Sequence, residues 1–156
     1  MENNDSQSLG FNIIKSDDIA PLYNDICNII DNERNKIATL VNAKICLINW
    51  HIGKRINDEI LFNRRADYGQ QIVRKLSQKL TERYGKGWSE KKLRHCLRSA
   101  ETFSEDEIIS ATQKQLSWTH LKTLMYIKEP IERQFYMLMC CNEHWDTRTL
   151  DEKIDK

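Results

Sequence analysis

The fold is decided by WSEKKLRHCLRSAETF, residues 88–103. Wound as a helix from Ser89, this stretch has an apolar side and a basic side. The apolar side consists of Leu93, Cys96, Leu97 and Ala100. The basic side carries Lys91, Arg94, His95 and Arg98 at positions i, i+3, i+4 and i+7. The pattern predicts a helix that packs on a core and presents positive charge to its surroundings.

The residues before this stretch predict a second amphipathic helix. GQQIVRKLSQKLTERYG, residues 69–85, has its apolar row at Ile72, Val73, Leu76 and Leu80. A short turn containing glycine joins the two segments. Residues 69–103 therefore have the outline of a helix-turn-helix pair, in which the second helix is free to enter a DNA groove.

Charge is segregated along the chain, although the formal net charge is only +1. Residues 64–98 contain eleven Lys and Arg against three Asp and Glu, a net charge of +8. The flanking residues 1–63 and 99–156 carry −3 and −4. Such a basic segment is typical of a surface that binds a polyanion.

Two groups of cations are predicted to contact DNA. Arginine offers a bidentate fork to guanine, and lysine mostly meets phosphate. On the second helix the candidates are Lys91, Lys92, Arg94, His95 and Arg98; on the first helix and the turn, as backbone contacts, they are Arg74, Lys75, Lys79 and Lys86. In the alternative interpretation, these side chains bind an acidic partner protein or remain solvated.

Upstream, residues 17–65 predict a long helical arm. Ser16 or Asp17 is placed to cap it, and residues 1–16 are expected to be flexible. The apolar row is Ile19, Leu22, Ile26, Ile29, Ile30, Ile37, Leu40, Val41, Ile45, Ile48, Ile52, Ile56 and Ile60. The pattern fits one helix, or two with a break near 49–53. An unbroken helix would measure roughly 65–70 Å, so either it bends back on its own domain or a second chain covers it in a homodimer.

Downstream, residues 104–156 predict a C-terminal helical unit. Four helix starts have an apolar residue before the N-cap and another at the fourth helical position, a hydrophobic staple. The sets are Trp88, Ser89 and Leu93; Phe103, Ser104 and Ile108; Leu116, Ser117 and Leu121; and Trp145, Asp146 and Leu150. Ser104 with Glu107 adds a capping box. This pattern favours folding roles for the tryptophans over base stacking.

The helices of this unit have their own apolar rows. The helix from Ser117 is expected to continue through Leu121, Leu124, Met125 and Lys128 until Pro130. The next is expected to bury Ile131, Phe135, Leu138 and Met139, and the last Leu150 and Ile154. Five Gly, two Pro and no alternating β-branched runs complete an all-α prediction, with residues 17–156 as one domain.

The cysteines and the apolar segments indicate the compartment. Cys27, Cys46, Cys96, Cys140 and Cys141 are odd in number and lack CxxC spacing, so we expect small buried side chains in a reducing environment. The chain has no signal-peptide core and no run of eighteen apolar residues. A cytoplasmic protein without membrane partners is the expectation.

Catalytic and metal-binding motifs are weak. Cys140 and His144 lack a second ligand pair, and GKGW at residues 85–88 is not a phosphate-binding loop. Asp151, Glu152 and Lys153 match the (D/E)xK part of a nuclease motif but lie on a predicted terminal helix. The sequence therefore predicts neither a catalytic residue nor a metal or other cofactor.

Four blocks resemble the N-terminal domain of the bacterial YhcG-type proteins. They are NWHIGKRI (49–56), YGQQIVRKLSQKLTERYGKGWSEKKLRHCLRSAETF (68–103), QLSWTHLKTLMYIKEPIERQFYM (115–137) and HWDTRTLDEKI (144–154). The resemblance covers roughly residues 17–156, although LRHCLRSAETF replaces the aromatic-rich helix usual in the family.

The resemblance implies a helical, helix-turn-helix-like domain that precedes a C-terminal PD-(D/E)XK nuclease domain. The family's catalytic positions would lie outside this chain, and we expect the natural protein to continue beyond Lys156. The expected function is a non-catalytic DNA-binding or targeting module. The alternative is a module for protein interaction or self-association through the long helix.

Overall fold

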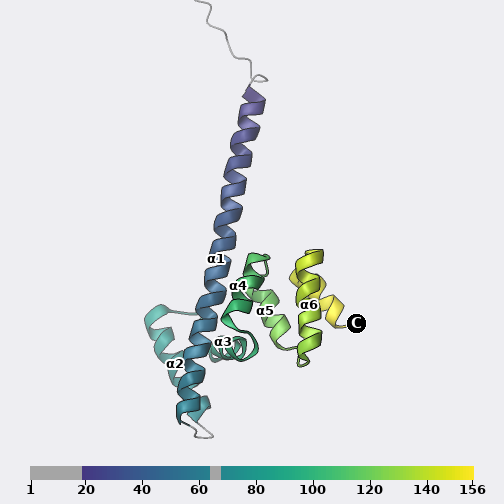
Figure 1. The fold of residues 1–156 in the computed structure, drawn as a ribbon. Helices are drawn as coiled ribbons and strands as arrows, with labels where there is room; N and C mark the ends of the chain where they lie inside the picture. Colours follow the sequence, from purple (N-terminus) through teal and green to yellow (C-terminus); the bar gives the residue numbers. More distant parts are fainter. Residues whose placement is uncertain (1–18, 64–67) are drawn as a thin grey trace, which may run out of the picture. The chain divides into compact units, whose positions relative to one another are not determined.

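The computed structural model describes residues 19–63 and 68–156, which contain seven helices and no strand. The helices are α1 (Ala20–Asn63), α2 (Tyr68–Tyr84), α3 (Glu90–Thr102), α4 (Glu105–Gln113), α5 (Trp118–Met125), α6 (Pro130–Glu143) and α7 (Thr147–Ile154) (Figure 1). The all-α prediction is confirmed. The expected flexible start, the cap at Ser16 or Asp17 and most of the turn before α2 lie outside the described residues.

The long helix is unbroken. Of the two alternatives for residues 17–65, the structure contains the single helix, and residues 49–53 lie inside α1. By its contacts the chain separates into two compact units, one ending at Ile37 and the other spanning Ala38–Lys156. The organisation of residues 17–156 as one domain stays a prediction.

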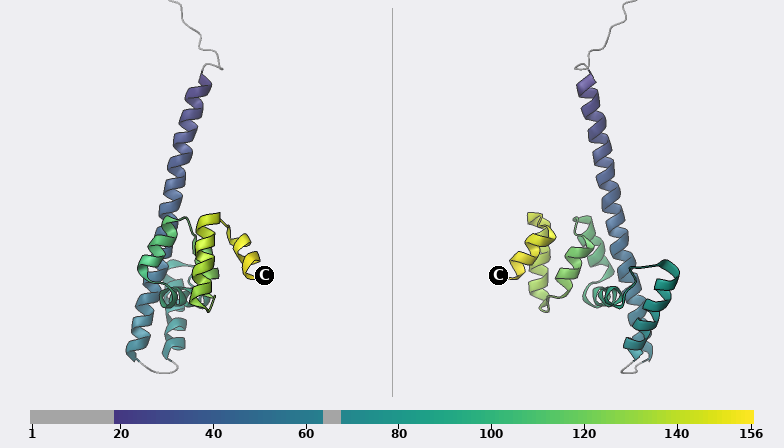
Figure 2. Two further views of the ribbon diagram at one scale, coloured as in Figure 1. Left: turned by 45° about the vertical axis from the view of Figure 1, so that its right-hand side comes forward. Right: turned by 180° about the vertical axis from the view of Figure 1, so that it is seen from behind.

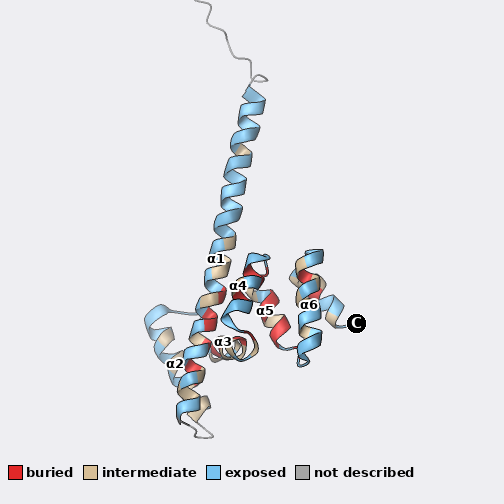
Figure 3. Ribbon diagram, viewed as in Figure 1, coloured by how far each residue is buried: buried red, intermediate tan, exposed pale blue. Residues whose placement is uncertain are grey.

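Within the unit Ala38–Lys156, the residues that α1 buries between 45 and 50 are not its isoleucines. Cys46, Asn49 and Trp50 are buried, whereas Ile45 and Ile48 are 45% and 53% exposed. Figure 3 shows the buried residues of α1 where it passes α3 and α4. The apolar row therefore did not identify the packed side of α1 at residues 45–50, although it did at Ile56, which is buried.

Gly53 explains why this face is the packed one. A Cβ atom at residue 53 would overlap the carbonyl group of Cys96 on α3. The two helix backbones thus approach more closely than any side chain would permit. Gly53 is a packing residue of α1 and not a helix break.

Polar side chains of α1 complete the contact by donating hydrogen bonds to backbone carbonyls. Trp50 Nε1 donates to the Phe103 oxygen at 2.8 Å, and Asn57 Nδ2 donates to the Leu97 oxygen at 3.2 Å. Asn42 Nδ2 donates to the Leu116 oxygen at 2.7 Å. These bonds hold α1 against α3 and against the segment before α5.

Two apolar clusters form the core. The first joins α1, α2 and α3 through Ile56, Val73 and Leu93, with the predicted α2 row packed against them. The second joins α1 to α4, α5, α6 and α7 through residues such as Cys46, Ile108 and Leu121. The predicted apolar sides of α2 and α3 are confirmed.

The four predicted N-caps are confirmed. Ser89, Ser104, Ser117 and Asp146 each accept a hydrogen bond from a backbone N–H of the helix that they precede. The reciprocal bond of a capping box is found at Ser117 and not at Ser104. At Ser117 the reciprocal acceptor is the buried side chain of His120, which accepts from the Ser117 backbone N–H at 3.1 Å.

Two predictions for the C-terminal helices were wrong: the end of α5 and the buried side of α6. Helix α5 ends at Met125, so Lys128 lies beyond it. On α6, Ile131, Phe135 and Leu138 are 83%, 54% and 53% exposed, and Cys140 is the buried residue.

These side chains are exposed because α6 packs with another side against α5 and α7, the helices beside it in Figure 2. Arg133 donates to the Ile127 oxygen at 3.0 Å, and the Tyr136 hydroxyl donates to the Lys153 oxygen at 3.3 Å. Arg133, Tyr136 and the buried Cys140 share the packed side of α6, which is opposite to the side that carries Ile131, Phe135 and Leu138.

Among the described residues, no helix combines the length and apolar composition that crossing a membrane requires.

Replacing Gly53 by alanine should destabilise the protein by about 1–3 kcal/mol, because the new methyl group overlaps the Cys96 carbonyl. Urea unfolding measures the loss. The matched control is Gly69→Ala, whose Cβ would meet the nearest atom, on Ile60, at 3.5 Å. This control should stay within about 1 kcal/mol of the wild type. Equal effects of the two substitutions would contradict the packing role of Gly53.

Candidate nucleic-acid interface

Helix α3 is held from several sides, which decides where its cations point. Leu93, Cys96 and Ser99 are fully buried. The helix contacts α2 and α5 as well as Gly53 of α1. Lys91 and Arg94 are exposed, and Lys92, His95 and Arg98 are partly buried. The predicted basic side is therefore a surface, but its members differ in what they contact.

Arg98 is tied to the end of α5. Its Nε atom donates to the Met125 carbonyl oxygen at 3.1 Å, and its guanidinium lies 4.7 Å from the centre of the Tyr126 ring. The Met125 oxygen is an acceptor at a helix C-terminus, where a cation is favoured. Arg98 thus links α3 to α5 and adds positive charge beside Tyr126.

His95 lies on the other side of the same tyrosine. Its Nδ1 atom is 2.9 Å from the Tyr126 hydroxyl, and the two rings meet edge to face. Partial burial lowers the pKa of His95 from its ordinary value of 6.5, and the positive charges of Lys122 and Lys91 lower this pKa further. The pKa of His95 is therefore sensitive to the positive charges of this surface.

Tyr126 and Lys122 are functional candidates that the sequence did not reveal. Both belong to the α5 region, at least twenty residues after the end of α3, and Tyr126 is 49% exposed. They join the surface only because α5 packs against α3. We call Lys91, Arg94, His95, Arg98, Lys122 and Tyr126 the α3 basic surface.

Glu90 offsets part of this charge. Its carboxylate lies 3.8 Å from Arg74 Nε on α2 and 4.0 Å from a terminal nitrogen of Arg94. Such exposed pairs contribute little to stability. They do bring Arg74 close to the α3 basic surface.

The other cations predicted to contact DNA are not part of the α3 basic surface. Lys75, Lys79 and Lys86 are exposed on α2 and the following turn. Lys92 lies 4.7 Å from the centre of the Trp88 ring.

Trp88 itself packs against the first core cluster, and its carbonyl accepts from Ser77 Oγ at 2.8 Å. Trp145 packs against the second cluster. Packing roles for both tryptophans are confirmed.

The (D/E)xK triplet makes structural contacts on α7. Asp151 accepts from the Thr123 hydroxyl at 3.2 Å, Glu152 pairs with Arg148 at 3.1 Å, and Lys153 lies over Trp145. Over residues 19–63 and 68–156, no three His, Cys, Asp or Glu side chains are grouped closely enough to hold a metal ion.

The thiols are unreactive where they are buried. Burial raises the pKa of Cys46, Cys96 and Cys140 to about 11. A thiol with such a pKa stays protonated at neutral pH and is a weak nucleophile. All five cysteines are free, and Cys27 and Cys141 are partly exposed.

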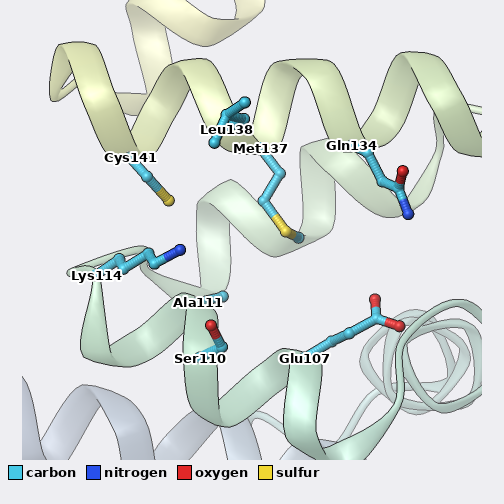
Figure 4. A pocket seen from close by; sticks show the side chains of 8 residues that line it. All are labelled: Glu107, Ser110, Ala111, Lys114, Gln134, Met137, Leu138 and Cys141. Carbon is cyan, nitrogen blue, oxygen red and sulfur yellow. The ribbon is translucent and has the colours of Figure 1, made fainter.

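A hollow of about 190 Å³ lies between α4 and α6. Figure 4 shows Met137 and Cys141 reaching from α6 toward Ala111 and Lys114, with Glu107 at the far end. The lining lacks histidine, and its one thiol, Cys141, has a pKa raised by burial. This hollow has no arrangement of nucleophile and base, and it does not include the α3 basic surface.

The fold and the surface define a class of protein: an all-α domain with a cationic helix at its surface. The chain belongs to the DUF1016 N-terminal domain family, whose model matches residues 25–156. A relative described as "Putative nuclease YhcG", from Escherichia coli (strain K12), is 35% identical over 74 residues.

That alignment covers 47% of this chain and 20% of the relative, so the matched part is a fifth of that protein. The expected relation to the YhcG-type family is confirmed. No solved structure matches the chain.

The charge of the α3 basic surface predicts how His95 titrates. An NMR titration should give His95 a pKa below 6.5, and Lys122→Gln should raise this pKa because a nearby positive charge is removed. Lys75→Gln on α2 is the control and should leave the pKa unchanged.

The lowered pKa of His95 also predicts how the stability of the fold depends on pH. Because the pKa of His95 is lower in the folded protein than in the unfolded chain, protonation opposes folding, and stability declines as the pH falls below 6.5. A pKa at or above 6.5 in the wild type would contradict the described surface.

Proposed function

We propose that this chain is a non-catalytic module that binds DNA through the α3 basic surface. The observation that carries the proposal is that His95 and Arg98 of α3 both contact the half-exposed Tyr126, while the charges of Lys91 and Lys122 act on His95. Cations on a helix suit phosphate contacts, and an aromatic ring among them suits contact with a sugar or a base.

The contacts assign different roles to the cations. Lys91 and Arg94 are exposed and are proposed to meet DNA directly. Arg98 is already engaged with the Met125 carbonyl and the Tyr126 ring, so it is proposed to position the tyrosine while adding charge. Lys75, Lys79 and Lys86 are proposed to extend the contact along the DNA backbone.

The family relation supports a role in targeting. The relative's printed description is that of a putative nuclease, and the matched segment is a fifth of its length. We propose that domains of this kind deliver a PD-(D/E)XK nuclease domain to DNA in the cytoplasm. This chain supplies the binding part of that activity.

Binding to duplex DNA should weaken with salt. If four cations meet phosphates, log K against log salt should have a slope of about −3.6, at about 0.9 per phosphate. The variant Lys91→Glu with Arg94→Glu should lose most of the affinity and reduce the slope by about 1.8. Fluorescence anisotropy measures both quantities.

The matched control is Arg148→Glu with Lys156→Glu, which changes the net charge equally at exposed positions on and after α7. It should keep nearly all of the affinity. If the two double variants bind alike, binding depends only on net charge and the α3 basic surface is not the site.

A second candidate function is association of the chain through α1. Eleven large apolar side chains between residues 19 and 48 are exposed. Exposed apolar patches of this extent mark interaction sites in soluble proteins. The homodimer therefore remains a proposal alongside DNA binding.

Sedimentation equilibrium should show a dimer at micromolar concentrations. Ile26→Glu with Ile30→Glu should give a monomer with unchanged helicity, because both residues are exposed on α1 and charge opposes burial in an interface. A wild-type protein that stays monomeric at high micromolar concentration would remove this candidate.

A further inference from the structure

An apolar groove lies between α1 and α2, wholly inside the unit Ala38–Lys156. It has a volume of about 500 Å³, and its apolar lining consists of Ile52, Ile56, Leu76, Leu80, Tyr84 and Trp88. A neighbouring hollow of about 310 Å³ shares Ile56 and Leu76 and extends the groove along α2. This shape is suited to the apolar side of a helix.

The rim of the groove is basic. Arg55 lines the groove directly. Arg83 lies 5.1 Å from the centre of the Tyr84 ring, and Lys92 lies 4.7 Å from that of Trp88. Glu59 pairs with Arg55 at 3.0 Å, so it offsets one of these three charges. The groove therefore favours an apolar helix that carries acidic residues.

An apolar row on α1 leads into this groove. Val41, Ile45 and Ile48 are about half exposed and precede Ile52 at spacings of four, three and four residues. Such spacings place the four side chains on one face of a helix. This face is distinct from the one that buries Cys46 and Trp50.

The first part of α1 has the properties that the groove requires. Ile19, Tyr23, Ile26 and Ile30 follow the same spacing of four, three and four residues, and each is 44–64% exposed. Residues 19–33 contain Asp25, Asp31 and Glu33 and no lysine or arginine. This segment is therefore an apolar helix with a net charge of −3.

The segment that fills the groove must come from another molecule. Residues 19–33 and 51–56 belong to one uninterrupted helix, and two segments of a single helix cannot lie side by side. In a dimer with two-fold symmetry the same contact forms twice, so residues 19–33 of each copy would lie in the groove of the other. This exchange requires the two α1 helices to run antiparallel.

We propose that two copies of this chain pair through antiparallel α1 helices, with residues 19–33 of each in the basic-rimmed groove of the other. This inference depends on the association proposed above and adds its partner, direction and contact residues. Stable dimers bury about 800 Å² on each partner. The pairing would cover the exposed row Ile19, Tyr23, Ile26 and Ile30 with the groove of the other copy.

A charge-swap experiment on the full chain tests the pairing. Asp31→Lys with Glu33→Lys should weaken the dimer roughly tenfold at low salt, and so should Arg55→Glu with Arg83→Glu, because each places like charges together. The variant with all four substitutions should recover nearly wild-type affinity. Sedimentation equilibrium gives each dissociation constant.

The control and the alternative outcomes separate the two proposals. Arg148→Glu with Lys156→Glu should leave the dimer unchanged. If the wild-type protein dimerises but the variant with all four substitutions does not recover its affinity, the groove assignment is wrong and association through α1 still stands. A monomeric wild-type protein would overturn both.

Discussion

The close approach of α1 and α3 at Gly53 is the constraint on which the rest of the structure depends. No side chain fits between residue 53 and the Cys96 carbonyl, so the two backbones are in contact there. Trp50 and Asn57, which flank Gly53 on α1, add hydrogen bonds to the Phe103 and Leu97 carbonyls. With one side of α3 held in this way, Lys91 and Arg94 lie on its exposed side.

The fold accommodates the basic segment by giving several cations a structural partner. Arg98 and Lys92 lie against aromatic rings, and Arg74 and Arg94 share Glu90. These contacts offset part of the repulsion among the cations, since the face of an aromatic ring and a carboxylate both attract positive charge. The consequence is a surface with a few exposed cations rather than a uniformly charged helix.

The two proposed activities use different cations. DNA binding is assigned to Lys91, Arg94 and their neighbours around Tyr126, whereas the groove uses Arg55, Arg83 and Lys92 on its rim. On α3, Lys91 and Arg94 are exposed, whereas Lys92 lies over the ring of Trp88, which packs against the first core cluster. The proposed dimer would present two copies of the α3 basic surface.

The sequence by itself determined the helical class, the start of the later helices and the basic side of α3. These features are local: an N-cap such as Ser89 needs only the backbone three residues ahead. Only the tertiary structure decided that Gly53 packs, that Ile131 and Phe135 face outward, and that Lys122 and Tyr126 join the site. Periodicity shows that a helix has an apolar side, but the neighbouring helices select which side is buried, and those contacts link residues far apart in the chain.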